Sequence, residues 1–128
     1  MAGAVLSYPG STVRLSGLDD PYYVLVEIES DLGKASKNVY SIFLDTFVPQ
    51  LESIYASLNG QAEVDSLEGD FVLQLISQPR GYFEVSAQLS NFDRSSRFET
   101  RFKVDQTYLP KFIRNLRSLG VKSVHESV

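Results

Sequence analysis

The sequence predicts an α+β fold, a single two-layer domain in which a mainly antiparallel sheet packs two amphipathic helices on one face. Three features indicate it. Several segments alternate apolar with polar residues, as strands with one buried face and one wet face do. Short turns separate most of these segments, so neighbouring strands are expected to run antiparallel. Two other segments repeat apolar residues at helical spacing, and each of them follows a strand.

The composition is that of one globular domain, and we therefore treat residues 1–128 as a single unit. Its 43% hydrophobic and 22% charged residues provide for both a core and a solvated surface. With 12 Lys and Arg against 16 Asp and Glu, the net charge is -4. This charge argues against general affinity for nucleic acid phosphates and is compatible with a basic partner.

The chain contains no cysteine, which excludes disulfides, thiolate metal sites and cysteine nucleophiles. This absence fits a reducing compartment. The first residues, MAGAVLSYPG, lack the basic region and the long apolar run of a signal peptide, and no stretch approaches the length of a membrane span. We therefore expect a cytoplasmic protein without membrane contact.

Eight segments carry strand patterns. In residues 22–30, Val24, Val26 and Ile28 are expected to face the core, because charged residues alternate with them. Residues 71–76 are apolar on both sides except at Gln74, which is typical of a central strand. The predicted strands cover residues 4–7, 12–16, 22–30, 37–44, 61–67, 71–76, 83–89 and 97–104.

An amphipathic helix follows the last strand, over residues 107–119. Asp105 and Thr107 are both candidate caps, since either side-chain oxygen can accept from the unpaired N–H groups of the first turn. Thr107 is the better candidate because it places Pro110 in the first turn, where proline removes no helical hydrogen bond. The apolar stripe consists of Leu109, Phe112, Ile113, Leu116 and Leu119.

The other helix begins in the same way after the fourth strand. Its segment Thr46-Phe47-Val48-Pro49 parallels Thr107-Tyr108-Leu109-Pro110, and the two helices are expected to stop at Gly60 and Gly120. Two explanations stay open: an internal duplication of a strand–strand–helix unit, or two corners that met the same steric needs independently. The stripe of this helix consists of Phe47, Leu51, Ile54, Tyr55 and Leu58.

Residues for catalysis, cofactors or metals are not indicated, so we expect no enzyme. The motifs GxSxG, GxGxxG and GxxxxGK[ST] do not occur, and the single histidine, His125, has no partner at a motif spacing. Glu63, Asp65, Glu68 and Asp70 crowd into eight residues, but their spacing is not that of a calcium loop. Carboxylates on a strand edge and a turn usually serve solvation.

The run Asp105-Gln106-Thr107-Tyr108-Leu109 is the most distinctive in the chain. Together with the residues before it, it resembles the WapI family of bacterial immunity proteins, the cytosolic antidotes of WapA-type polymorphic toxins that are delivered between neighbouring cells. The resemblance spans residues 22–119. It further includes Phe47, Leu51, Leu58-Asn59-Gly60-Gln61-Ala62, Glu68, Phe71, Leu73, Leu75, Gly81, Phe83, Val85, Phe98, Phe102 and Leu116.

The resemblance implies a non-enzymatic cytoplasmic protein that neutralises a cognate toxin C-terminal domain, often a nuclease used in contact-dependent inhibition, by blocking its active site. An acidic surface suits this task because it can occupy the basic cleft in which a nuclease holds phosphate. The alternative is a small non-enzymatic regulatory or ligand-binding domain of unknown partner. An enzyme would instead need a deep apolar pocket with converging carboxylates.

Two acidic groups are candidates for the toxin-binding surface. Glu27, Glu29 and Asp31 share one strand face by their period of two. A second group lies on a strand and the turn after it, and we favour this group because a turn can protrude into a cleft where a sheet face cannot. It consists of Glu63, Asp65, Glu68 and Asp70.

Overall fold

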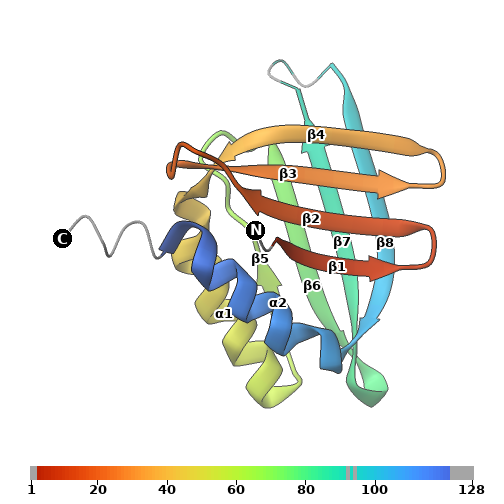
Figure 1. Ribbon diagram of the computed structural model, residues 1–128. Helices are drawn as coiled ribbons and strands as arrows, with labels where there is room; N and C mark the ends of the chain where they lie inside the picture. The colour runs from red at the N-terminus through yellow and green to blue at the C-terminus, as the bar shows by residue number, and fades with distance from the viewer. Residues whose placement is uncertain (1–2, 92, 94, 122–128) are drawn as a thin grey trace.

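The computed structural model describes residues 3–91, 93 and 95–121, and His125 lies outside them. Within the described residues, eight strands form two antiparallel four-stranded sheets, and a helix follows each sheet along the chain (Figure 1). The α+β class with antiparallel strands and two helices is therefore confirmed. The strands nevertheless divide into two sheets, where we had expected one.

The two sheets follow one another in the sequence. The first sheet contains β1 (Ala4–Tyr8), β2 (Ser11–Gly17), β3 (Tyr23–Ser30) and β4 (Gly33–Tyr40), each paired with the next. A 3-10 turn, η1 (Ser41–Phe43), then leads into α1 (Leu44–Ser57). The second sheet contains β5 (Gln61–Glu63), β6 (Phe71–Gln78), β7 (Tyr82–Ser90) and β8 (Arg97–Asp105). After it come η3 (Gln106–Tyr108), α2 (Leu109–Leu116) and a π-helical turn, η4 (Arg117–Val121).

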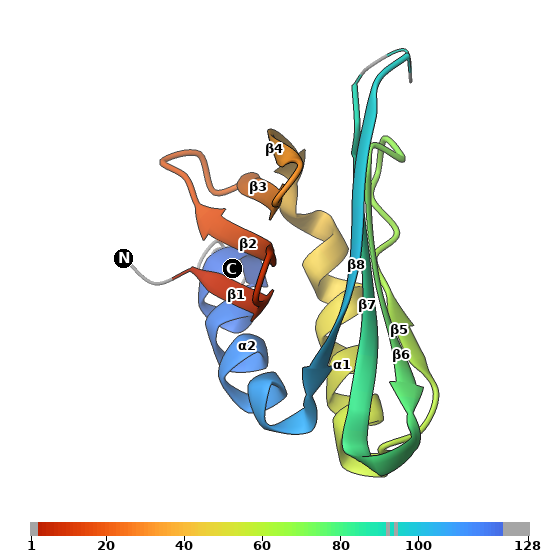
Figure 2. The ribbon, with the colours of Figure 1, turned by 90° about the vertical axis from the view of Figure 1, so that its right-hand side faces the viewer.

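The sheets cross, and the helices fill the space that they leave (Figures 1 and 2). Strand β8 packs against β1, β2 and β3, whereas α1 packs on β5 and α2 on β1. The hydroxyls of Ser11 and Thr100, 3.1 Å apart, connect β2 with β8. No helix in the part of the chain that the structure describes is long and apolar enough to span a membrane.

The core lies between the inner faces of both sheets and the apolar stripes of both helices. Its largest fully buried side chains are phenylalanines, and each contributes about 1.5–3 kcal/mol by leaving water. The rings of Phe43 and Phe71 meet edge to face with centroids 5.6 Å apart, which ties the start of α1 to β6. These phenylalanines are Phe43, Phe47, Phe71, Phe83 and Phe112.

The strand predicted over residues 37–44 is shifted toward the C-terminus relative to β4, which spans Gly33–Tyr40. β4 ends at Tyr40, because Phe43, Phe47 and Leu51 recur at helical spacing and are all buried. The strand predicted over residues 61–67 is also shorter than expected. β5 stops at Glu63, and one further backbone hydrogen bond, from the N–H of Val64 to the carbonyl of Leu73, continues the pairing over 2.8 Å.

Asp105, not Thr107, caps the second helical segment. Its Oδ1 accepts from the N–H of Thr107 at 2.9 Å, while Thr107 lies inside η3 and is exposed. The cap moved because the 3-10 turn precedes the α-helix, so Asp105 is the last extended residue. Pro110 still lies in the first turn of α2, as predicted.

Neither helix stops at the predicted glycine. α1 ends at Ser57, and Leu58 takes the left-handed conformation with φ 55° while its N–H bonds the carbonyl of Ile54 at 2.7 Å. After α2, the helical path continues as η4 through Gly120. The stripe of α2 is confirmed, with Leu119 partly buried at its end.

Both halves of the chain repeat the order of four strands, a 3-10 turn and a helix. Leu44 and Leu109 begin the two α-helices, and in this register Phe47 matches Phe112 and Leu51 matches Leu116. All these side chains are buried. The Thr-x-x-Pro parallel in the sequence is shifted from this register by about one helical turn, so the repeat exists in the fold, although in another alignment.

Candidate functional site

The loop between β5 and β6 presents carboxylates to solvent. Along residues 63–68, Glu63, Asp65 and Glu68 are exposed, while Val64 and Ser66 are buried between them. The Ser66 hydroxyl accepts from the N–H of Phe71 at 3.3 Å, and the Ser66 carbonyl accepts from the N–H of Gly69 at 3.1 Å. These bonds close the loop and hold its acidic side chains outward.

Asp70 belongs to the interior, unlike the other three carboxylates of its group. It is 4% exposed, and its Oδ2 lies 3.2 Å from Nζ of Lys37 on β4. The Ser66 hydroxyl lies 3.4 Å from its other oxygen, and its backbone carbonyl accepts from the N–H of Ser90 at 2.9 Å. Asp70 therefore ties the first sheet to the second, and it adds nothing to the exposed acidic surface.

Helix α1 covers the free edge of β5 and carries a further exposed carboxylate. The Gln50 side-chain amide bonds both backbone groups of Glu63, accepting from its N–H at 3.0 Å and donating to its carbonyl at 3.3 Å. Asp45 is exposed in the first turn of the same helix. Residues 38–79 contain neither Lys nor Arg, so every charged side chain of this segment is a carboxylate, and the cations that pair with Asp70 and Glu52 come from Lys37 and Arg117 outside it.

We refer to Asp45, Glu63, Asp65 and Glu68 as the acidic surface. Sequence reasoning found three of these residues and missed Asp45, although the absence of cations from residues 38–79 was a signal that could have pointed to it. A stretch of this length without Lys or Arg concentrates negative potential wherever it folds together.

The second predicted group, on β3, lies in a mixed environment. Glu27 pairs with Nζ of Lys34 at 3.3 Å and stands opposite Arg14 on β2. Glu29 stands opposite Lys34 on β4, and Asp31 is exposed in the turn beyond the strand. Cations thus alternate with these carboxylates. The structure also keeps the group apart from the acidic surface, since Glu29 and Asp31 lie at the far end of β3 (Figure 1).

An aromatic pair lies at the start of β3, the end opposite to Glu29 and Asp31. The rings of Tyr23 and Tyr40 stack with centroids 4.6 Å apart. A hydrogen bond with Tyr40 raises the pKa of Tyr23 to about 12, with smaller contributions from burial and from the negative charges of Asp20 and Glu68. The loop between β5 and β6 is joined to this region by the ion pair of Asp70 with Lys37 on β4, the strand that pairs with β3.

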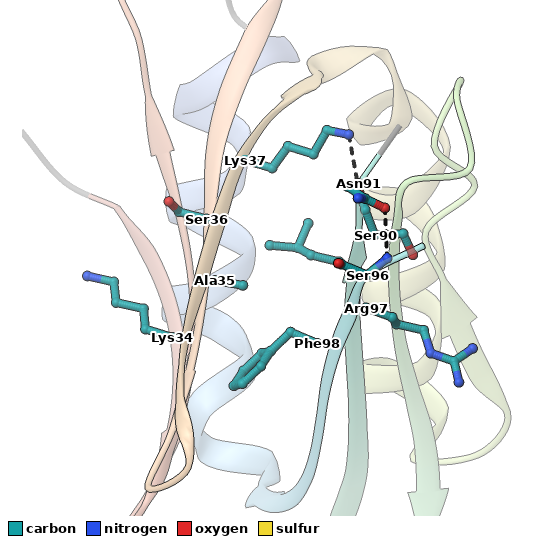
Figure 3. A pocket seen from close by; sticks show the side chains of 10 residues that line it. Lys34, Ala35, Ser36, Lys37, Ser90, Asn91, Ser96, Arg97 and Phe98 are labelled. Carbon is teal, nitrogen blue, oxygen red and sulfur yellow. Dashed lines mark hydrogen bonds between the residues drawn. The ribbon is translucent and has the colours of Figure 1, made fainter. Parts of the chain in front are cut away.

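A pocket of about 380 Å³ opens between β4 and the paired ends of β7 and β8 (Figure 3). Ala35 and Phe98 face into it, and Leu89 also lines it, while Lys34, Ser36 and Arg97 point away. Lys37 lies at one end, where Nζ donates to the Ser90 carbonyl at 3.2 Å and pairs with Asp70. No sequence pattern indicates this pocket, because β4 is distant in the chain from β7 and β8, which supply the rest of its lining.

The chemistry of this pocket is that of a binding cleft. Its apolar walls suit an apolar group, and its polar rim offers hydroxyls and the Asn91 amide, which is itself engaged with the N–H of Ser96 at 3.0 Å. The Lys37 charge is already matched by Asp70. Across residues 3–91, 93 and 95–121, His, Asp and Glu form no cluster of three or more that could hold a metal ion.

Comparison with known proteins gives a family and a fold. The profile described as the Immunity protein WapI-like family matches residues 7–120. Among proteins with curated descriptions, none matches significantly. A crystal structure of Trypanosoma brucei MRP1/MRP2 is similar over 93% of this chain and 79% of its own, with a TM-score of 0.59 and 15% sequence identity. At this identity the likeness concerns the fold alone.

Proposed function

Because the chain belongs to the WapI-like immunity protein family, we propose that it binds a cognate toxin domain in the cytoplasm and blocks that domain's active site. The toxin is the C-terminal domain of a polymorphic, contact-dependent toxin, and its activity is that of a nuclease. The protein itself acts without catalysis, since inhibition by occlusion needs only a complementary surface.

The acidic surface is the observation that carries this proposal. Asp45, Glu63, Asp65 and Glu68 are all exposed, on a side to which residues 38–79 bring no cation. A nuclease binds phosphate with basic residues, so its cleft and this surface have opposite potentials. Such complementarity steers encounter and disfavours partners of the wrong charge.

The candidate interface differs by two residues from the acidic group that the sequence analysis favours. Asp70 is removed because it is buried against Lys37, and Asp45 is added because it is exposed on α1, the helix that covers the edge of β5. Glu63, Asp65 and Glu68 are retained. The group of Glu27, Glu29 and Asp31 becomes the comparison site, since Arg14 and Lys34 lie among its carboxylates.

Charge reversal tests the proposal. The double variant Asp65→Lys/Glu68→Lys changes two exposed side chains, and Glu29→Lys/Asp31→Lys is the matched control with the same change in net charge. The probe is the C-terminal domain of a WapA-type toxin sought among the reading frames that neighbour the gene of this protein. We expect the first variant to lower the association rate by about tenfold or more at low salt and far less at high salt, because exposed charges are screened. Protection of cells that express the toxin is the second readout.

Four results are informative. A slower association for the first variant alone supports the acidic surface. Equal slowing in both variants means that net charge matters and the site does not. Unchanged kinetics with full protection would move the interface elsewhere, and a parent protein that neither binds nor protects contradicts the proposed function itself.

The pocket favours one second candidate, the ligand-binding domain. Its volume of about 380 Å³ falls within the usual range of ligand sites, and Ala35, Leu89 and Phe98 give it apolar walls. Ala35→Leu would fill part of this space. An immunity protein should retain toxin binding after this change, whereas a protein that works through a pocket ligand should lose its activity.

A further inference from the structure

Three large apolar side chains lie exposed at one corner of the molecule. Tyr22 is 70% exposed, Ile42 60% and Leu67 68%. They come from the turn before β3, from η1 and from the loop between β5 and β6. Exposed apolar residues that gather on one patch often mark an interaction site, whereas isolated ones need no explanation.

Hydrogen bonds bring the first two of these segments together. The N–H of Ser41 donates to the Tyr22 carbonyl at 2.8 Å, and the Ser41 hydroxyl donates to the Pro21 carbonyl at 3.0 Å. Ile42 is the next residue along the chain. The turn before β3 and η1 are therefore joined directly, with Tyr22 and Ile42 on the joined segments.

The loop between β5 and β6, which carries Leu67, approaches the same corner. The ion pair of Asp70 with Lys37, at 3.2 Å, holds the end of the loop that carries Leu67 and Glu68 against β4, the strand that leads into η1. Figure 1 shows this loop near the end of β4, where η1 begins. The three exposed apolar residues therefore lie on segments that are held to the two ends of the β3–β4 pair at this corner, and Asp45 and Glu68 follow closely after Ile42 and Leu67 in the chain.

This corner is fixed before any partner arrives. Asp20 Oδ1 accepts from the N–H of Tyr22 at 2.9 Å, the rings of Tyr23 and Tyr40 stack, and the Asp70–Lys37 ion pair anchors the end of the loop. An interface that is already ordered loses less conformational entropy on binding. The corner therefore has what an interface centre needs, namely apolar area on a rigid support.

We propose that Tyr22, Ile42 and Leu67 form the apolar centre of the interface with the toxin, and that the acidic surface forms its rim. This inference rests on the proposed function. The partner surface is an apolar patch bordered by Lys and Arg, because the corner is bordered by Asp19, Asp20, Asp45, Asp65 and Glu68, which are all exposed.

Charge also decides against a second copy of this chain as the occupant. A two-fold contact would place the same patch on both protomers, so that the acidic rims would face each other. Residues 38–79 supply no Lys or Arg to relieve this repulsion. A basic partner meets no such cost.

The test uses three single variants, Tyr22→Ser, Ile42→Ser and Leu67→Ser. Because these side chains are mostly exposed, their removal should leave folding intact, and circular dichroism checks this. The matched control is Leu32→Ser, which removes a side chain that is 92% exposed at the tip of the β3–β4 turn. The probe is the same C-terminal toxin domain as in the charge-reversal experiment, and dissociation rates are measured.

We expect at least two of the three variants to bind about tenfold or more weakly, mainly through faster dissociation, while Leu32→Ser is unchanged. If the parent protein binds and all three variants bind equally well, the inference is overturned and the proposed function stands. If the parent protein neither binds nor protects, both are overturned. Sedimentation of the protein alone adds one outcome: a dimer that Ile42→Ser dissolves would assign the corner to self-association and overturn the inference.

Discussion

Replacing Lys37 with Met should destabilise the fold more than replacing its partner Asp70 with Asn. The charged groups of the two residues are 3.2 Å apart at the contact between the sheets, and their side chains differ in burial. The side chain of Lys37 is 29% exposed and that of Asp70 only 5%. Whichever partner remains must keep its charge without the other. The loss of stability is therefore larger for Lys37→Met, because the charge that then remains unpaired is that of the more buried residue, Asp70.

The magnitudes follow from what each remaining group can still bind. After Asp70→Asn, Lys37 keeps the Ser90 carbonyl at 3.2 Å and its access to water, so the loss is that of one charge-assisted hydrogen bond, about 1.5–3 kcal/mol. After Lys37→Met, the Asp70 carboxylate stays buried with the Ser66 hydroxyl at 3.4 Å, a long hydrogen bond. An unpaired buried charge costs about 3–5 kcal/mol.

Urea denaturation of both single variants and of the double variant measures this difference. Lys37→Met/Asp70→Asn should be more stable than Lys37→Met alone, because it removes the unpaired charge. Lys34→Met is the control on the same strand: its pair with Glu27 at 3.3 Å is exposed, so its loss should be about 0–1 kcal/mol. If Lys37→Met were no more destabilising than Asp70→Asn, the argument from burial would be refuted.

Three further predictions concern the second helix and the tyrosine pair. Asp105→Ala should lower the free energy of unfolding by about 1 kcal/mol and Thr107→Ala by less, since only Asp105 caps, and equal losses in urea would contradict the assignment. Phe112→Ala should cost about 3–5 kcal/mol in the same assay, because this side chain is fully buried, and parental stability would mean that the stripe is exposed. Tyr23 should titrate near pH 12 in ultraviolet absorbance, and Tyr40→Phe should lower that value. Because folding raises this pKa from 10.0, the pair stabilises the fold below pH 10 and loses this contribution as the pH rises toward 12. The free energy of unfolding should therefore fall more between pH 10 and 12 in the parent protein than in Tyr40→Phe, and an equal fall in both would be evidence against it.

The burial of individual side chains was predictable at most positions, although Tyr55 and Leu58, predicted in the stripe of the first helix, are exposed near its C-terminal end. Val24, Val26 and Ile28 are buried as their alternation required, and Phe112 and Leu116 are buried as helical spacing required. Periodicity follows from the local geometry of strand and helix, so one sequence suffices to find it. The division into two sheets could not be predicted in this way, because the pattern of a strand indicates which face is buried but not which strand it pairs with.

In the candidate site, too, local features could be predicted from the sequence and long-range contacts could not. The exposed carboxylates Asp65 and Glu68 were visible in the sequence because they flank a turn. The burial of Asp70 was not, since it depends on Lys37, which precedes it by an entire helix and a strand. The pocket beside Phe98 likewise depends on how the two sheets cross, which local patterns do not specify.

The repeated halves of the fold agree in their cores and differ in their surfaces. Helices α1 and α2 bury matching residues, yet α1 carries Asp45 and Glu52 without a cation, while α2 carries Lys111 and Arg114 without an acid. The ion pair of Glu52 with Arg117 joins the two helices where these opposite charges meet. The buried register maintains the fold in both halves, so the exposed positions are free to diverge. Because α1 carries carboxylates and α2 carries cations, a basic partner can approach α1 but not α2, although the topology of the two halves is the same.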